Sequence, residues 1–175
     1  MVKLSLLLIG ISLLSACASV SVEDYAGNQP RMDVREFFDG DLSAHGVVKN
    51  RSGEVIRYFN ATIDASWENG IGKLDETFYF NDGEVQKRIW FLTPDDDGQL
   101  NGTANDVIGS SVLKVAGNSL FMKYILRIDY DDDSLDLEID DRMYRVSDRV
   151  VINESTMRKW GFTVGQIILV IEKTP

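Results

Sequence analysis

Apolar and polar residues alternate along most of the chain, and turn-forming residues interrupt the alternation at short intervals. The clearest stripe takes every second position from Leu120 to Tyr130, and a second stripe runs from Leu135 to Met143. A period of two predicts strands with one buried face, whereas helices would need a period near 3.6. We therefore predict strands near residues 44–50, from 54 to 68, and over 71–80, 84–91, 99–105, 112–116, 120–130, 135–146, 150–153 and 162–172. Short helices are expected within Pro30–Phe38 and at Thr156–Trp160.

Two turns fix the pairing of neighbouring strands. Asn69-Gly70 is a strong signal for a two-residue type I′ hairpin, which places Glu68 opposite Ile71. Asn81-Asp82-Gly83 suits a three-residue loop, and a similar loop is expected at Arg51-Ser52-Gly53. Counting outward from the first two turns gives an apolar face with the pairs Phe59–Phe80, Ala61–Phe78, Ile63–Glu76, Ala65–Leu74, Phe78–Gln86, Glu76–Arg88 and Leu74–Trp90.

Short connections between successive strands favour an all-β, up-and-down antiparallel β-barrel. With about 8–10 strands a twisted sheet tends to curl and close, and one or two short helices complete the expected domain over residues 30–175. A two-sheet sandwich is the alternative.

The N-terminus has the layout of a secretory signal. Lys3 is followed by the apolar run Leu4–Leu14, which is too short to span a bilayer as a helix. The sequence Leu14-Ser15-Ala16-Cys17 resembles the lipobox of bacterial lipoproteins. The resemblance implies removal of residues 1–16, lipid attachment at Cys17, and a tether over residues 17–29. An ordinary signal peptide is the alternative. By analogy with enterobacterial sorting, Ala18 favours the outer membrane, with the domain facing the periplasm.

Charge and cysteine content narrow the possible partners. Cys17 is the only cysteine, so a lipidated chain has none for a disulfide. Without Lys3 the chain has 17 Lys and Arg against 28 Asp and Glu, a net charge of −11. An acidic surface is repelled by anionic lipid and by nucleic acid. Membrane attachment would therefore depend on the lipid, and nucleic-acid binding is not expected.

The paired residues Glu76 and Arg88 interrupt the apolar face. Buried charges are costly unless they are paired, and Asp141 on its own inward stripe is placed to join them. One interpretation is a polar clamp inside a cavity, holding the polar end of an apolar ligand. The walls would then be Trp67, Trp90 and Phe78. The other interpretation is a purely structural ion pair.

Other polar groups do not form a recognisable reaction centre or metal site. Residues 95–97 and 131–133 are runs of aspartate, but neither follows the EF-hand spacing, and both fit charged turns. His45 is the only histidine, and no G-x-S-x-G motif accompanies it. We expect no enzymatic activity, no metal and no cofactor.

Six short motifs are distributed over most of the chain: Phe37-Phe38-Asp39-Gly40, Ala44-x-Gly46, Arg88-x-Trp90, Gly102-Thr103-Ala104-x-Asp106-x-x-Gly109, Asp140-Asp141-x-Met143-Tyr144 and Gly161-x-x-x-Gly165. With these motifs the chain resembles an uncharacterised family of proteobacterial lipoproteins, a domain of unknown function associated with lipocalin-like (calycin) barrels. The resemblance implies a barrel fold and an anchored chain, and it implies no activity, substrate or catalytic residue.

Two functions fit these observations. The first is an anchored periplasmic lipoprotein that binds a small apolar or amphipathic molecule in a barrel cavity. The alternative is an interaction or scaffolding lipoprotein of the cell envelope, whose barrel is filled by side chains. Its docking patch would use Ile89, Phe91, Phe121 and Ile125 on the outer face.

Overall fold

The computed structural model describes residues 19–130 and 133–174. Cys17 and the predicted signal segment before it lie outside this range, as do Asp131 and Asp132. The elements are η1 (Val22–Tyr25), α1 (Val34–Phe37), β1 (Gly40–Asn50), β2 (Val55–Glu68), β3 (Ile71–Phe80), β4 (Val85–Pro94), β5 (Leu100–Ala104), β6 (Val107–Ile108), β7 (Ser111–Val112), β8 (Lys114–Ala116), β9 (Ser119–Tyr130), β10 (Asp133–Arg145), β11 (Val150–Lys159) and β12 (Phe162–Lys173).

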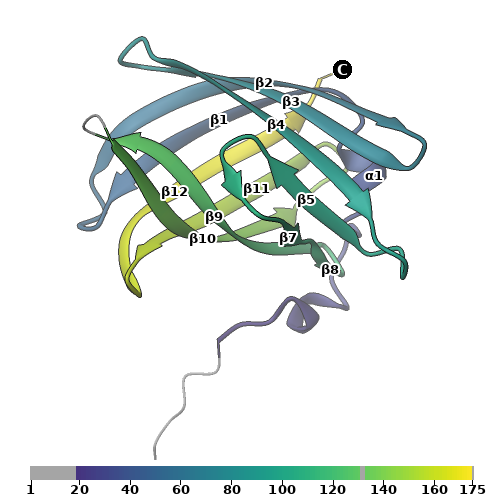
Figure 1. Cartoon of the computed structure of the whole chain (residues 1–175). Helices are drawn as coiled ribbons and strands as arrows, with labels where there is room; N and C mark the ends of the chain where they lie inside the picture. Colours follow the sequence, from purple (N-terminus) through teal and green to yellow (C-terminus); the bar gives the residue numbers. More distant parts are fainter. Residues whose placement is uncertain (1–18, 131–132, 175) are drawn as a thin grey trace, which may run out of the picture.

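The described strands form one antiparallel sheet that curls strongly on itself (Figure 1). Strands β1 to β5 pair in sequence order, β9 to β12 do the same, and β12 pairs with β1. The short strand β6 directly follows β5 yet pairs with β9 at the far end of the sheet order. The predicted all-β, up-and-down antiparallel architecture is confirmed. The described sheet has 12 strands, more than the 8–10 expected, and its order ends at β6 and β7, which do not pair with each other, so it forms a strongly curled half-barrel. The sandwich alternative is wrong because the described strands share one sheet.

The predicted registers of β2, β3 and β4 are confirmed pair by pair. Glu76 lies opposite Ile63 on one side and Arg88 on the other. Asn69 and Gly70 both have positive φ, as a type I′ turn requires. The turn residues were sufficient to predict the register of these strands. Burial of the apolar face keeps that register, since a slip of one residue would move every apolar side chain to the outer face.

The helix predicted at Thr156–Trp160 is wrong. Residues up to Lys159 continue β11, where Thr156 pairs with Asp140 and Lys159 pairs with Phe162. Trp160 and Gly161, both with positive φ, form the two-residue turn into β12. Pairing with β10 and β12 provides hydrogen-bond partners for the backbone N–H and C=O groups of this segment. A short helical turn would lose these inter-strand hydrogen bonds and could not compensate for them.

The region after β5 is also more broken than predicted. The expected strand at Val112–Ala116 is divided at Leu113 into β7 and β8, because β7 pairs with β5 whereas β8 pairs with β9. Strand β6 was not expected. These short pieces connect the two ends of the curled sheet.

The expected tether is partly docked. Ser21 caps η1, Val22 is buried, and the Tyr25 ring packs against Phe121 and Tyr144 on the outer face of the sheet. Among the described residues, no helix is long and apolar enough to cross a membrane.

One end of the curled sheet is covered by α1, which begins after the capping residue Asp33. The Asp33 carboxylate accepts hydrogen bonds from the backbone N–H groups of Arg35 and Glu36. Phe37 and Phe38 from this helix are both buried in the main apolar cluster. The predicted helical turn within Pro30–Phe38 is therefore confirmed, and it seals that end of the interior.

Candidate functional site

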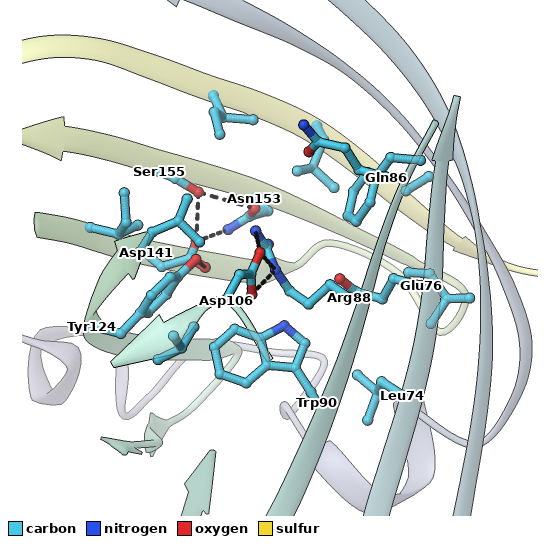
Figure 2. Close-up of a pocket in the computed structure, with 18 of the residues that line it drawn as sticks. Leu74, Glu76, Gln86, Arg88, Trp90, Asp106, Tyr124, Asp141, Asn153 and Ser155 are labelled. Carbon is cyan, nitrogen blue, oxygen red and sulfur yellow. Dashed lines mark hydrogen bonds and ion pairs between the residues drawn. The ribbon is translucent and has the colours of Figure 1, made fainter. Parts of the chain in front are cut away.

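The interior of the curled sheet contains a cavity of about 880 Å³. Its walls are mostly aliphatic and aromatic, with a polar cluster contributed by β3, β4, the β5–β6 connection and β9 to β11 (Figure 2). Val34 and Phe38 line it at the α1 end, whereas Glu84 and Val85 line it near the β3–β4 hairpin. The interior is hollow, contrary to the prediction of the scaffolding alternative that side chains fill it.

Arg88 projects from β4 into this cavity and binds Asp106 (Figure 2). Its Nε lies 2.9 Å from both carboxylate oxygens of Asp106, and its Nη2 lies 2.7 Å from Oδ2. Burial disfavours the charged form of Arg88. The hydrogen bonds to Asp106, together with the nearby acidic groups of Tyr124, Glu76 and Asp106, outweigh burial and raise the pKa of the guanidinium. The predicted charge partner, Glu76, lies opposite in register, yet the observed ion pair is with Asp106.

Glu76 also lines the cavity, from the neighbouring strand β3 (Figure 2). Within residues 19–130 and 133–174 its carboxyl group makes no hydrogen bond or ion pair. Burial raises the pKa of Glu76 to about 7; Arg88 opposes this shift, while Asp106 and Asp141 add to it. The Glu76 carboxyl group therefore changes from its neutral to its ionised form near neutral pH.

Asp141 lies across the cavity and is held by three donors. Ser155 Oγ donates to Asp141 Oδ1 at 2.9 Å, Tyr124 OH donates to Oδ2 at 3.2 Å, and the Asn153 side-chain amide also donates to Oδ1. Burial raises the pKa of Asp141, and the three hydrogen bonds partly offset that rise. The prediction that Asp141 joins the cavity cluster is thus matched in position, although no direct ion pair links it to Arg88 in the described structure.

Aromatic side chains form one wall of the cavity. Trp90 packs edge-on against Tyr124, with ring centroids 5.3 Å apart, and Phe78 packs between Phe59 and Phe80. Trp90 and Phe78 thus lie where the sequence placed them.

Trp67 does not line the cavity, which corrects its assignment as a wall residue. Its indole N–H donates to the Phe38 carbonyl at 2.7 Å, and its ring covers Gly72 while Arg35 stacks on it. Because Gly72 has no side chain, the ring folds across its own hairpin towards α1 and away from the hollow.

The remaining candidates lie outside the cavity. His45 is exposed on β1 and contacts the Asn60 side chain at 2.7 Å. Asp95 accepts backbone N–H bonds within its own turn, as a turn-stabilising residue does. The described chain contains no group of three or more His, Cys, Asp or Glu side chains arranged to hold a metal ion.

The outer patch proposed for the scaffolding alternative is not continuous. Phe91 is exposed, but Phe121 is partly covered by Tyr25 and Tyr144. Ile89 and Ile125 are half-buried. The four side chains thus do not act as one open apolar surface.

A family model described as "Protein of unknown function (DUF3833)" matches residues 11–173. The chain belongs to the DUF3833 family. This confirms the predicted resemblance to a family of unknown function, and no curated protein matches the sequence. Among solved structures, the DUF3833 chain is similar to an S-type phycobiliprotein lyase, CPES, from Guillardia theta. The TM-score is 0.49 at 12% identity, with 89% of this chain and 99% of that chain covered.

Four residues of the polar cluster in this DUF3833 cavity were not among the predicted site residues: Asp106, Tyr124, Asn153 and Ser155. Tyr124 lies on the recognised inward stripe of β9, so its direction was available. Asn153 and Ser155 alternate with Val151 on the inner face of β11. The predicted strand ended at Asn153, so Ser155 lay beyond it, and the polar side chain of Asn153 gave no sign of an inward position. Asp106 lies in the irregular connection after β5, where no periodicity gives a direction.

Proposed function

We propose that this DUF3833 protein is a lipid-anchored envelope protein that holds a small apolar or amphipathic molecule in its interior. The cavity carries this proposal. Its volume of about 880 Å³ lies within the range of roughly 300–1,000 Å³ typical of small-molecule sites. An apolar lining with a few convergent polar groups is the usual composition of such sites. We propose binding and not catalysis, because the single histidine of the sequence, His45, lies on the outer face, so no imidazole is placed to activate the Ser155 hydroxyl in the cavity.

A purely apolar dye tests the binding proposal without involving the polar cluster. We expect the purified protein to bind diphenylhexatriene with an increase in its fluorescence. Ile167 lines the cavity on β12, so the Ile167→Trp substitution fills part of the hollow and should weaken dye binding about tenfold or more. Gln166 is the exposed neighbour on the same strand, and Gln166→Trp should bind like the wild type.

Absence of dye binding by the wild-type protein would contradict the proposal. Equal weakening by the Gln166 and Ile167 variants would also contradict it, because the dye would then lie outside the cavity.

We further propose that Cys17 carries the lipid and that the protein is attached to the outer membrane facing the periplasm. Val22 is buried on the sheet, so at most five residues, 17 to 21, separate the lipid from the packed domain. At about 3.5 Å per residue they reach roughly 17 Å, which would keep the domain close to the bilayer. One acyl chain holds only marginally, so two or more chains are needed for stable attachment.

Cys17→Ser should abolish metabolic labelling with a palmitate analogue and move the protein out of the membrane fraction. Ser19→Ala, two residues away, is the matched control and should keep both the label and the membrane location. Labelling that persists in the Cys17→Ser protein would refute lipid attachment at this residue.

A further inference from the structure

The acceptor oxygens of the cavity are unequally occupied. Both carboxylate oxygens of Asp106 are bound by Arg88, and those of Asp141 are bound by Tyr124, Asn153 and Ser155. Glu76 has no such donor among the described residues, although it lines the same cavity. Its carboxyl group is therefore the one acidic group of this cluster that remains available to a bound molecule.

The polar cluster is also negatively charged. Three carboxyl groups, from Glu76, Asp106 and Asp141, face the single guanidinium of Arg88. Asp106 binds Arg88 through Nε and Nη2 and neutralises its charge. An entering anion would therefore meet a neutralised guanidinium beside two further carboxyl groups.

Cations near the ends of the cavity strands do not reverse this balance. Arg57 is paired with Asp82 and Glu84, and Arg127 is paired with Asp136, so their charges are neutralised by carboxylates outside the polar cluster. Lys87 also borders the cavity, but it is exposed to solvent and alternates with Arg88 along β4, so it points away from the polar cluster.

We propose that the ligand is an amphipathic amine or similar organic cation, whose donor group binds the Glu76 carboxylate while its apolar part lies along Trp90 and Phe78. This inference rests on the proposed binding function and names the chemical class of its ligand. A protonated amine supplies both the positive charge and the hydrogen-bond donors that Glu76 lacks. A fatty acid would add a fourth negative group to the cluster and would leave Glu76 without a donor.

The protonation of Glu76 is consistent with this choice. The charged and titratable groups that face it are Arg88 on β4, Asp106 before β6, Tyr124 on β9 and Asp141 on β10. With a pKa of about 7, Glu76 is mostly ionised at pH 8 and mostly neutral at pH 5.5. A cation bound to the ionised form gains a charge-assisted hydrogen bond, which a neutral carboxyl cannot offer.

Three ligands that differ only in the polar end separate the possibilities: dodecylamine, dodecanol and dodecanoic acid, each below its micelle concentration. At pH 8 the amine should displace diphenylhexatriene at about tenfold lower concentration than the alcohol, and the acid should be the weakest of the three. At pH 5.5 the advantage of the amine over the alcohol should fall to about twofold or less.

Glu76→Gln should remove the amine's advantage at pH 8 while leaving displacement by the alcohol unchanged. Asp75→Asn is the matched control, since Asp75 is the neighbour of Glu76 on the other face of β3, outside the cavity, and is paired with Lys73. That variant should keep the ranking of the three ligands.

Two results would overturn the inference: tighter binding of the acid than of the amine, or an amine preference that survives Glu76→Gln. Either result with normal dye binding would refute the ligand class and leave the proposed binding function intact. If the wild-type protein binds no dye at all, both proposals fail together.

Discussion

Glu76→Gln is expected to increase the free energy of unfolding at pH 8 by about 2–3 kcal/mol while changing it little at pH 4.5. Burial raises the pKa of Glu76 from 4.5 to about 7 in the folded protein. Between these two pH values the native state holds more protons than the unfolded state, so wild-type stability falls as pH rises. Each pKa unit corresponds to about 1.4 kcal/mol, and water entering the cavity screens part of the full effect.

Urea unfolding at pH 4.5, 6 and 8 measures this effect. The wild-type midpoint should decrease through this window, and the Glu76→Gln midpoint should decrease less. Glu84→Gln removes a carboxylate at the exposed hairpin end of the cavity and should retain the wild-type pH dependence. A Glu76→Gln protein whose stability depends on pH as steeply as the wild type would show that Glu76 is not desolvated.

A residue that lowers stability at neutral pH calls for a reason. Gln has nearly the same shape as Glu and would remove the cost of ionising a carboxyl group inside the fold. Such a cost is common at binding sites, where local stability is sacrificed for interaction with a ligand. The stability measurement therefore tests the same electrostatic property that the ligand series tests, but without any ligand.

The positions of Glu76 and Arg88 could be predicted from sequence because they depend on local rules. A two-residue turn at Asn69-Gly70 and a three-residue loop at residues 81–83 determine the pairing of β2, β3 and β4. Once the register is known, the alternation of side chains between the two faces of each strand determines which of them share the inner face. The partner of Arg88 could not be obtained in this way.

Asp106 reaches Arg88 from an irregular segment, so its direction depends on how the ends of the sheet approach one another. The sequence therefore predicted that Arg88 is a buried cation, but the predicted partner was Glu76 and the observed partner is Asp106. This difference changes the chemistry of the site. With Asp106 as the partner of Arg88, Glu76 becomes the free acidic group.

The polar face of β11 was missed for a different reason. Asn153 and Ser155 occupy inward positions that usually carry apolar side chains, so the strand lost its expected pattern midway. Both residues bind Asp141, which itself interrupts an apolar stripe on β10. Each strand alone shows only a break in its apolar alternation. Taken together, the inward polar residues of β10 and β11 form one hydrogen-bonded cluster.

Arg145 holds the covered end of the interior in place. Its guanidinium binds the Glu36 carboxylate at 2.5 and 3.2 Å and lies 5.5 Å from the centre of the Phe37 ring. It also donates to the backbone carbonyls of Arg31, Ser147 and Asp148. The Arg145 side chain is only 6% exposed, so water does not replace these donors readily.

Arg145→Met should lower the free energy of unfolding by about 3 kcal/mol, because it removes a buried charge with several hydrogen bonds and leaves carbonyl groups without donors. Glu36→Gln should cost about 1 kcal/mol or less, since the Glu36 side chain is 56% exposed and solvent can replace its bond. Urea unfolding compares the two variants, and hydrogen exchange at residues 34–38 should accelerate most in Arg145→Met. If both variants lose the same small amount of stability, the surface ion pair is the whole contribution of Arg145, and the backbone carbonyls do not depend on it.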